Sequence, residues 1–145
     1  MTEAEFSQQL SQLSSVAADL NRESDSINDL LSQYEAKIRA MNVGLEVSVD
    51  LIDRDTNLQR YKLMWAKLPM WDKGPDGKGK VYAGKEEWGL AIDSPRISSH
   101  QPALDTSREV RIAALESIPD LVAKLTEAAQ DRVDVIRKAK DLLNK

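Results

Sequence analysis

The stretch GPDGKGKV, residues 74–81, has the glycine and lysine spacing of a phosphate-binding loop. Such a loop leaves a strand, turns at its glycines and ends at a helix N-terminus whose amides point at phosphate. A Ser or Thr hydroxyl directly after the lysine then holds magnesium, but Val81 occupies that position here. The residues that follow Val81 are strand-like and contain two glycines. We therefore interpret the stretch as a long hairpin loop with a lysine-rich tip, not as a nucleotide site.

A second stretch, DRDTNL at residues 53–58, begins like a calcium-binding loop. A loop of this kind needs a glycine at its sixth position for a sharp bend and a bidentate glutamate at its twelfth. Those positions are Leu58 and Met64 in this chain. Without the bend and the last ligand, the stretch is predicted to be a turn between two strands.

Catalytic chemistry has few candidate residues. The chain has no cysteine and a single histidine, His100, which excludes disulfides, a cysteine nucleophile and metal sites built from thiolates or clustered histidines. Acidic residues at the strand ends are usually solvated, and no nucleophile or orienting partner accompanies them. These acidic residues are Asp50, Asp53, Asp55, Glu86 and Glu87. We expect a protein that is not an enzyme and holds neither a cofactor nor a metal.

Aromatic and basic residues gather between Arg60 and Trp88. All three tryptophans and two of the three tyrosines lie in this window, with seven Lys or Arg against four Asp or Glu. The window thus carries a net charge of +3. Because the whole chain carries −4, the residues outside the window together carry −7. Basic side chains interleaved with aromatics on a sheet can hold single-stranded nucleic acid by stacking and phosphate contacts. A nucleic-acid or nucleotide-ligand binder that uses the sheet and the loop 73–85 is therefore the alternative reading.

The aromatic residues divide into a predicted core and a predicted surface. Tyr61, Trp65 and Trp88 are expected on the buried face of the sheet, because a sheet under aliphatic helices needs large apolar side chains there. Trp71 stands at the edge of a loop, where a large side chain has less reason to be buried. The candidate partner contacts are Met70, Trp71, Lys73, Lys78 and Lys80.

Residues 1–42 are predicted to be helical. Thr2 and Glu5 have capping-box spacing, and apolar residues then recur at alternating steps of four and three, the rhythm of helices packed along a seam. Only Ser24 is polar in this stripe, and the segment NRESDS, residues 21–26, leaves a break in the helix open. The stripe consists of Phe6, Leu10, Leu13, Ala17, Leu20, Ser24, Ile27, Leu31, Tyr34, Ile38 and Met41.

Residues 105–145 are predicted to be helical as well. Thr106 and Glu109 form a second capping-box pattern, and Pro119 with Ser117 as N-cap predicts that a second helix begins there. The four-three rhythm returns in Val122, Leu125, Ala129, Arg132, Ile136, Ala139 and Leu143. Because the two terminal regions match in length, we expect the C-terminal helices to pack antiparallel on the N-terminal helix.

Residues 43–94 switch to a period of two, which predicts an antiparallel sheet of three to four strands. Leu45, Val47, Val49 and Leu51 alternate with polar residues, and KVYAG and EEWGLAID are expected as two further short strands. Residues 95–104, with Pro95 and Pro102, are predicted to be a connecting loop. The prediction is one α+β domain of helix, sheet and helix.

The charge and hydropathy of the chain narrow the function classes. A net charge of −4 argues against a protein whose whole surface grips nucleic acid. The acidic N-terminus does not have the pattern of a secretory signal and no apolar run could span a membrane, so we expect a cytoplasmic protein. The long seam predicts a non-catalytic interaction or scaffold module with a protein partner. The seam closes within one chain or pairs with a second copy as a homodimer, in which case Ser24 and Arg132 set the register.

Overall fold

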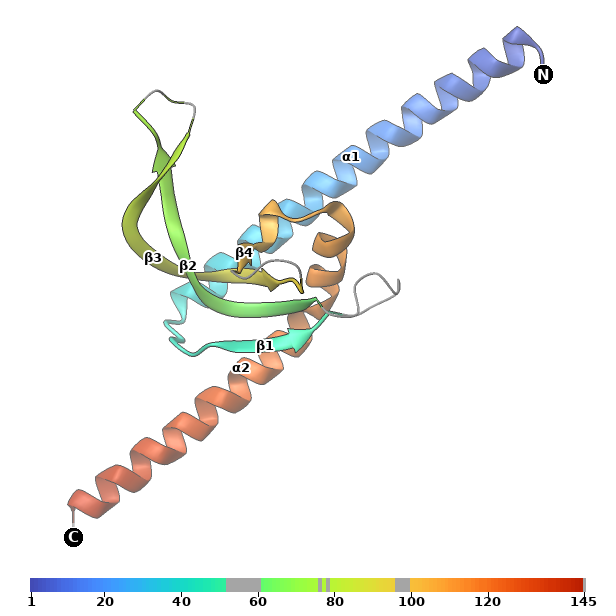
Figure 1. Cartoon of the computed structure of the whole chain (residues 1–145). Coiled ribbons are helices and arrows are strands. Elements are labelled where there is room, and N and C mark those ends of the chain that lie inside the picture. Colours follow the sequence, from blue (N-terminus) through green and yellow to red (C-terminus); the bar gives the residue numbers. More distant parts are fainter. Residues whose placement is uncertain (52–60, 76, 78, 96–99, 145) are drawn as a thin grey trace.

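A computed structural model describes residues 1–51, 61–75, 77, 79–95 and 100–144 of the chain. A long N-terminal helix, a four-stranded antiparallel sheet and a long C-terminal helix follow one another along the chain, so the expected α+β class and element order are confirmed (Figure 1). The elements are α1 (Glu3–Ala40), β1 (Val47–Asp50), β2 (Lys62–Lys73), β3 (Lys80–Asp93), β4 (Gln101–Pro102), the short 3-10 helix η2 (Ala103–Asp105) and α2 (Arg108–Leu143).

The sheet is a meander in which each strand pairs antiparallel with the next, in the order β1, β2, β3, β4. The residues expected to form two short strands form the single strand β3, which bends at Gly84, where φ is +74°. The partner strand β2 shifts register between Pro69 and Trp71, so the long hairpin curls along its length. The expected loop contains a short edge strand, β4, where Pro102 is tolerated because an edge residue needs no ladder N–H.

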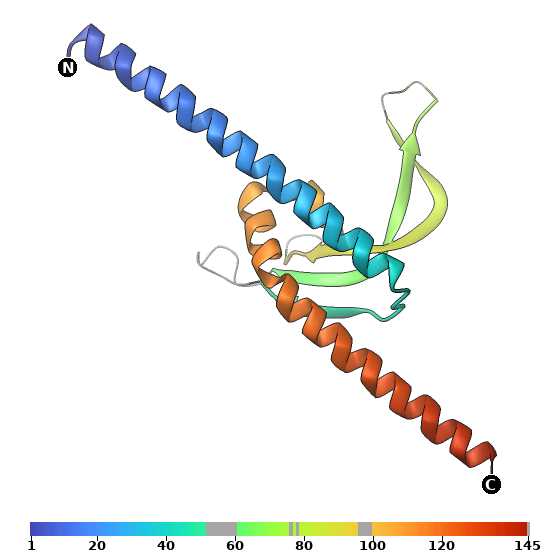
Figure 2. The same ribbon diagram turned by 180° about the vertical axis from the view of Figure 1, so that it is seen from behind.

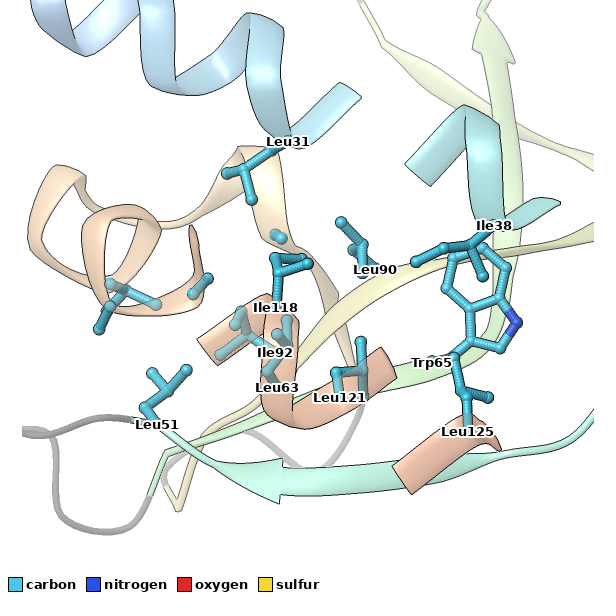
Figure 3. Close-up of a cluster of buried hydrophobic side chains, with 14 residues drawn as sticks. Leu31, Ile38, Leu51, Leu63, Trp65, Leu90, Ile92, Ile118, Leu121 and Leu125 are labelled. Atoms are coloured by element: carbon cyan, nitrogen blue, oxygen red, sulfur yellow. The ribbon is translucent and has the colours of Figure 1, made fainter. Parts of the chain in front are cut away.

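One face of the sheet carries the main core, shown in Figure 3. Trp65 is fully buried and its indole Nε1–H donates to the Val43 carbonyl oxygen at 3.1 Å. Leu31 and Ile38 of α1 and Leu121 of α2 pack in the same cluster. The remaining buried members are Leu51, Leu63, Leu90, Ile92, Ala103, Val110, Ala113, Ala114, Ile118 and Leu125. Met64, Ala66 and Leu68 alternate with these core residues along β2 and belong to a separate cluster on the other face of the sheet.

Helix α1 is continuous from Glu3 to Ala40, and its expected capping box is confirmed. The Glu5 N–H donates to the Thr2 hydroxyl at 3.2 Å, and the Thr2 N–H donates to the Glu5 carboxylate at 3.3 Å. No break occurs at residues 21–26. There the Arg108 Nε–H donates to the Ser24 hydroxyl at 3.2 Å. The polar residue of the stripe is therefore hydrogen-bonded to a side chain of α2.

Helix α2 differs from the prediction at both expected N-caps. Ser107, not Thr106, caps the helix, and its hydroxyl accepts from the Val110 N–H at 3.4 Å. A second helix does not begin at Pro119, which lies inside α2. The axis of α2 changes direction between its first turns and its long C-terminal part, as expected for an internal proline (Figures 1 and 2). The Ser117 hydroxyl donates to the Ala113 carbonyl oxygen at 2.7 Å instead of capping a helix.

The two long helices contact each other only near the sheet. Ser24 is bonded to Arg108, and the Asn28 side chain accepts from Arg111 at 2.7 Å, so the helices run in the same sense through this contact. Beyond it they extend away from the sheet to opposite ends of the molecule, where the two termini lie (Figure 2). The structure therefore differs from the expected antiparallel hairpin. The physical reason is that both helices use their inner parts to cover one sheet face, which leaves their outer parts apart.

The C-terminal part of α1 also caps the edge of β3 beside β4. The Leu90 N–H donates to the Glu35 carboxylate at 2.8 Å, and the Arg39 Nε–H donates to the Trp88 carbonyl oxygen at 2.9 Å. Arg39 also pairs with Glu35 at 3.2 Å and with Glu87 at 3.2 Å. An edge strand otherwise presents unpaired backbone groups to solvent or to another strand. Two charged side chains of α1 therefore satisfy the edge that β4 is too short to cover.

We predict that Glu35→Leu lowers the free energy of unfolding by about 1–3 kcal/mol, because it leaves the Leu90 N–H without its acceptor. Urea unfolding followed by tryptophan fluorescence measures this change. Glu127→Leu, on the exposed surface of α2, is the matched control and should change stability little. Equal stability of the two variants would contradict the capping role of Glu35.

Candidate functional site

The phosphate-loop spacing at residues 74–81 lies at a hairpin turn. The Gly77 N–H donates to the Gly74 carbonyl oxygen at 2.9 Å, and the Gly74 N–H donates to the Gly79 carbonyl oxygen at 2.7 Å. The chain enters from β2 and leaves as β3, so no helix N-terminus follows the lysine. The interpretation of this stretch as a hairpin loop is confirmed.

No metal or acid–base site emerges from the described part of the chain. Within that part, no group of three or more His, Asp or Glu side chains could hold a metal ion. The calcium-like stretch at residues 53–58 and the acidic residues Asp53 and Asp55 lie outside the described residues. His100 lines an open groove of 460 Å³ with Lys67, Trp71 and residues of β4, a mixture without an evident catalytic pair.

The outer part of the β2–β3 hairpin, residues 69–86, projects from the sheet (Figure 1) and contains most of the predicted contact residues. Trp71 and Tyr82 are register partners whose rings meet edge to face at 5.8 Å, and they are 53% and 48% exposed. Lys73 and Lys80 are also register partners, two residue pairs farther along the ladder. Because side chains alternate along a strand, these four residues share one face of the hairpin. We call it the aromatic-lysine face.

The other predicted contact residues are not part of that face. Met70 is exposed but lies at the register shift of β2, and it lines a different groove from Trp71, together with Glu35 and Arg39 of α1. Lys78 lies outside the described residues. Tyr82 was absent from the predicted set, although a register argument across the hairpin would have placed it opposite Trp71. The structure thus unites Trp71, Lys73 and Lys80 and adds Tyr82.

Trp65 and Trp88 belong to the body of the protein, as predicted. Their rings stack with centroids 6.5 Å apart, Trp65 is inside the core and Trp88 packs against it. The Lys67 ammonium lies 5.8 Å from the Trp88 ring centroid. Neither indole is available as a stacking platform comparable with Trp71.

One unpartnered apolar surface lies on the outer part of α1. We call residues 3–23 the N-arm. Its stripe follows the predicted four-three rhythm, and in the part of the chain that the structure describes nothing covers these side chains. Leu13 is 63% exposed, well above what a leucine on a covered seam would show. The stripe consists of Phe6, Leu10, Leu13, Ala17 and Leu20.

A second unpartnered stripe lies on the outer part of α2. We call residues 126–143 the C-arm. Ile136 is 48% exposed and Leu143 is 87% exposed, whereas Leu125 at the root of the arm is buried in the core. The stripe consists of Ala129, Arg132, Ile136, Ala139 and Leu143. Each arm is about 20 residues, or about 30 Å, long.

None of the described helices carries a stretch apolar and long enough to cross a membrane. Comparison of the chain with known protein families, with curated proteins and with solved structures gives no match.

Proposed function

We propose that this protein is a non-catalytic protein–protein interaction or scaffold module whose binding surfaces are the two helical arms. The observation that carries the proposal is the pair of open apolar stripes, one on each arm, projecting from opposite sides of a compact body (Figure 2). Stripes with a heptad rhythm pack by inserting side chains between those of a neighbouring helix. The arms therefore suit a helical partner surface.

The composition of the N-arm supports the need for a partner. The N-arm contains four serines together with Asp19 and Asn21, residues of lower helix propensity than Ala or Leu. Isolated helices of this length are marginal in water, and most helical stability in proteins comes from packing an apolar face. A helix with this sequence and an open stripe is stabilised when another helix covers it.

The test of this function is affinity capture from native extract, with and without nuclease, comparing three tagged proteins. We expect the wild type to retain a stoichiometric protein partner after nuclease treatment. Leu13→Asp should lose that partner, because a charge replaces an apolar residue on the stripe. Trp71→Ala is the matched control, since it removes a large exposed side chain away from the arms and should retain the partner. Equal retention by all three proteins would contradict the assignment to the arms.

We propose single-stranded nucleic-acid binding by the aromatic-lysine face as a second candidate function. The observation that favours it is the cross-strand pair Lys73–Lys80 beside the exposed Trp71–Tyr82 pair. Like charges directly opposite each other on a sheet are unfavourable, and an anionic ligand would relieve that repulsion. The aromatic pair could stack an unpaired base while the lysines contact phosphate.

Anisotropy titration of a labelled single-stranded oligonucleotide tests the second candidate. We predict that affinity falls with added salt and drops about tenfold or more in a Trp71→Ala, Lys73→Gln, Lys80→Gln variant, because stacking and phosphate contacts are both removed. The control variant Lys124→Gln, Lys138→Gln removes the same charge from α2 and should bind like the wild type. Absence of binding at low salt would end this reading.

A further inference from the structure

We infer that the partner of the arms is a second copy of this chain, with the N-arm of each copy packed antiparallel on the C-arm of the other. This inference rests on the proposed function and specifies its partner. It needs no surface other than the two arms already described. Four properties of the arms support it: their direction, their register, the sizes of the facing side chains and their charge.

The direction of the arms allows a closed dimer. They extend from opposite sides of the body, the N-arm toward the N-terminus and the C-arm toward the C-terminus, and they are similar in length (Figures 1 and 2). A two-fold axis perpendicular to the long direction lays the N-arm of one copy along the C-arm of the other. Tip then meets tip, root meets root, and both arms of both copies are covered at once. Such an isologous arrangement closes without leaving a surface for further growth.

The register of the two stripes matches in this arrangement. Counted from the tip toward the body, both stripes step by four, three, four and three residues. Each residue of one stripe therefore lies opposite a residue of the other stripe, as in an antiparallel coiled coil. The facing pairs are Phe6 with Leu143, Leu10 with Ala139, Leu13 with Ile136, Ala17 with Arg132, and Leu20 with Ala129.

The sizes of the facing side chains are complementary. Each alanine of one stripe meets a larger residue of the other, so no layer pairs two small side chains. Arg132, the single polar member of either stripe, faces Ala17, where its aliphatic stem can lie over the methyl group and its charge can reach solvent. Beside the seam, Val16 and Val135 occupy corresponding flanking positions and are both exposed in the single chain. A larger residue opposite a smaller one fills the space between two helices evenly.

The charges at the tips also match. Glu3 and Glu5 mark the tip of the N-arm, and the last turns of the C-arm carry Arg137, Lys138 and Lys140 together with the single acidic residue Asp141. In the register given above, Lys140 lies opposite Gln9, about one helical turn from Glu5, and Arg137 lies opposite Gln12, so the surplus of positive charge is near the acidic tip. The antiparallel pairing also places the positive end of one helix dipole beside the negative end of the other. A parallel pairing of two N-arms would instead set Glu3 and Glu5 against their own copies, and it would leave both C-arms bare.

The oligomeric state is the first test. Sedimentation equilibrium or light scattering should give twice the chain mass of 16.2 kDa for the wild type. Leu13→Asp should weaken association about 100-fold or more, because the two-fold axis places the charge in two layers of the dimer. The body should stay folded, since Leu13 lies outside the core, and an unchanged near-ultraviolet circular dichroism spectrum of the aromatic residues, all but Phe6 and Tyr34 of which lie in the sheet region, would verify this. A wild type that is monomeric across a dilution series would overturn the inference.

Cross-linking tests which arms meet. The natural chain has no cysteine, so Leu13→Cys and Ile136→Cys can be made singly, mixed and gently oxidised. We expect a disulfide-linked pair that contains one chain of each variant, since these positions face each other across the seam. Gln12→Cys mixed with Asp134→Cys is the control, because both residues point away from the seam, and it should link poorly. Linkage of Leu13→Cys chiefly to itself would overturn the antiparallel pairing of unlike arms.

The two tests together separate this inference from the proposed function. If the chain is monomeric and the Leu13→Asp variant fails to capture a protein that the wild type captures from native extract, the inference of a second copy is wrong. The proposed interaction module is then still supported. If the chain is monomeric and Leu13→Asp loses nothing, both proposals fail. A dimer that links Leu13→Cys to Ile136→Cys supports both.

Discussion

The structure depends on burying one face of a small sheet under two helices that are each longer than the sheet. Trp65 and Leu63 on the sheet need cover, and Leu31 of α1 with Leu121 of α2 provides it. Once these inner segments have packed, the rest of each helix has no sheet left to cover. The arms are thus the direct result of helix lengths that exceed the core, and their apolar stripes call for a surface that the body does not provide.

Periodicity explains how much of the fold could be predicted from the sequence. The four-three stripes and the period-two alternation identify which side of each element is apolar, and that side is buried wherever the body reaches it. A stripe does not encode what covers it, so the antiparallel hairpin was a reasonable prediction that the structure does not follow. Pro119 was expected to begin a second helix, but it lies inside one continuous helix that changes direction. Gly84 lies where two short strands were expected to separate, and it is accommodated within the single strand β3.

The candidate surfaces were predicted to different degrees. Trp71 was expected to be exposed because of its place at the edge of a loop, and it is. The cap formed by Glu35 and Arg39 on the edge of β3 could not be predicted, because these residues lie about 50 positions from the backbone groups that they bind and follow no local pattern. Long-range bonds between side chain and backbone become visible only when the helix is placed on the sheet.

The two polar positions of the stripes illustrate how location decides a residue's role. Both Ser24 and Arg132 were expected to set the register of a seam. Ser24 lies where α1 meets α2, and Arg108 of the same chain already binds it. Arg132 lies on the C-arm, beyond the reach of the body, where it faces the small Ala17 in the pairing that we infer. Ser24 therefore joins the two helices within a chain. In the pairing that we infer, Arg132 selects the register between chains, because a charge at a seam is tolerated only opposite a side chain small enough to let it reach water.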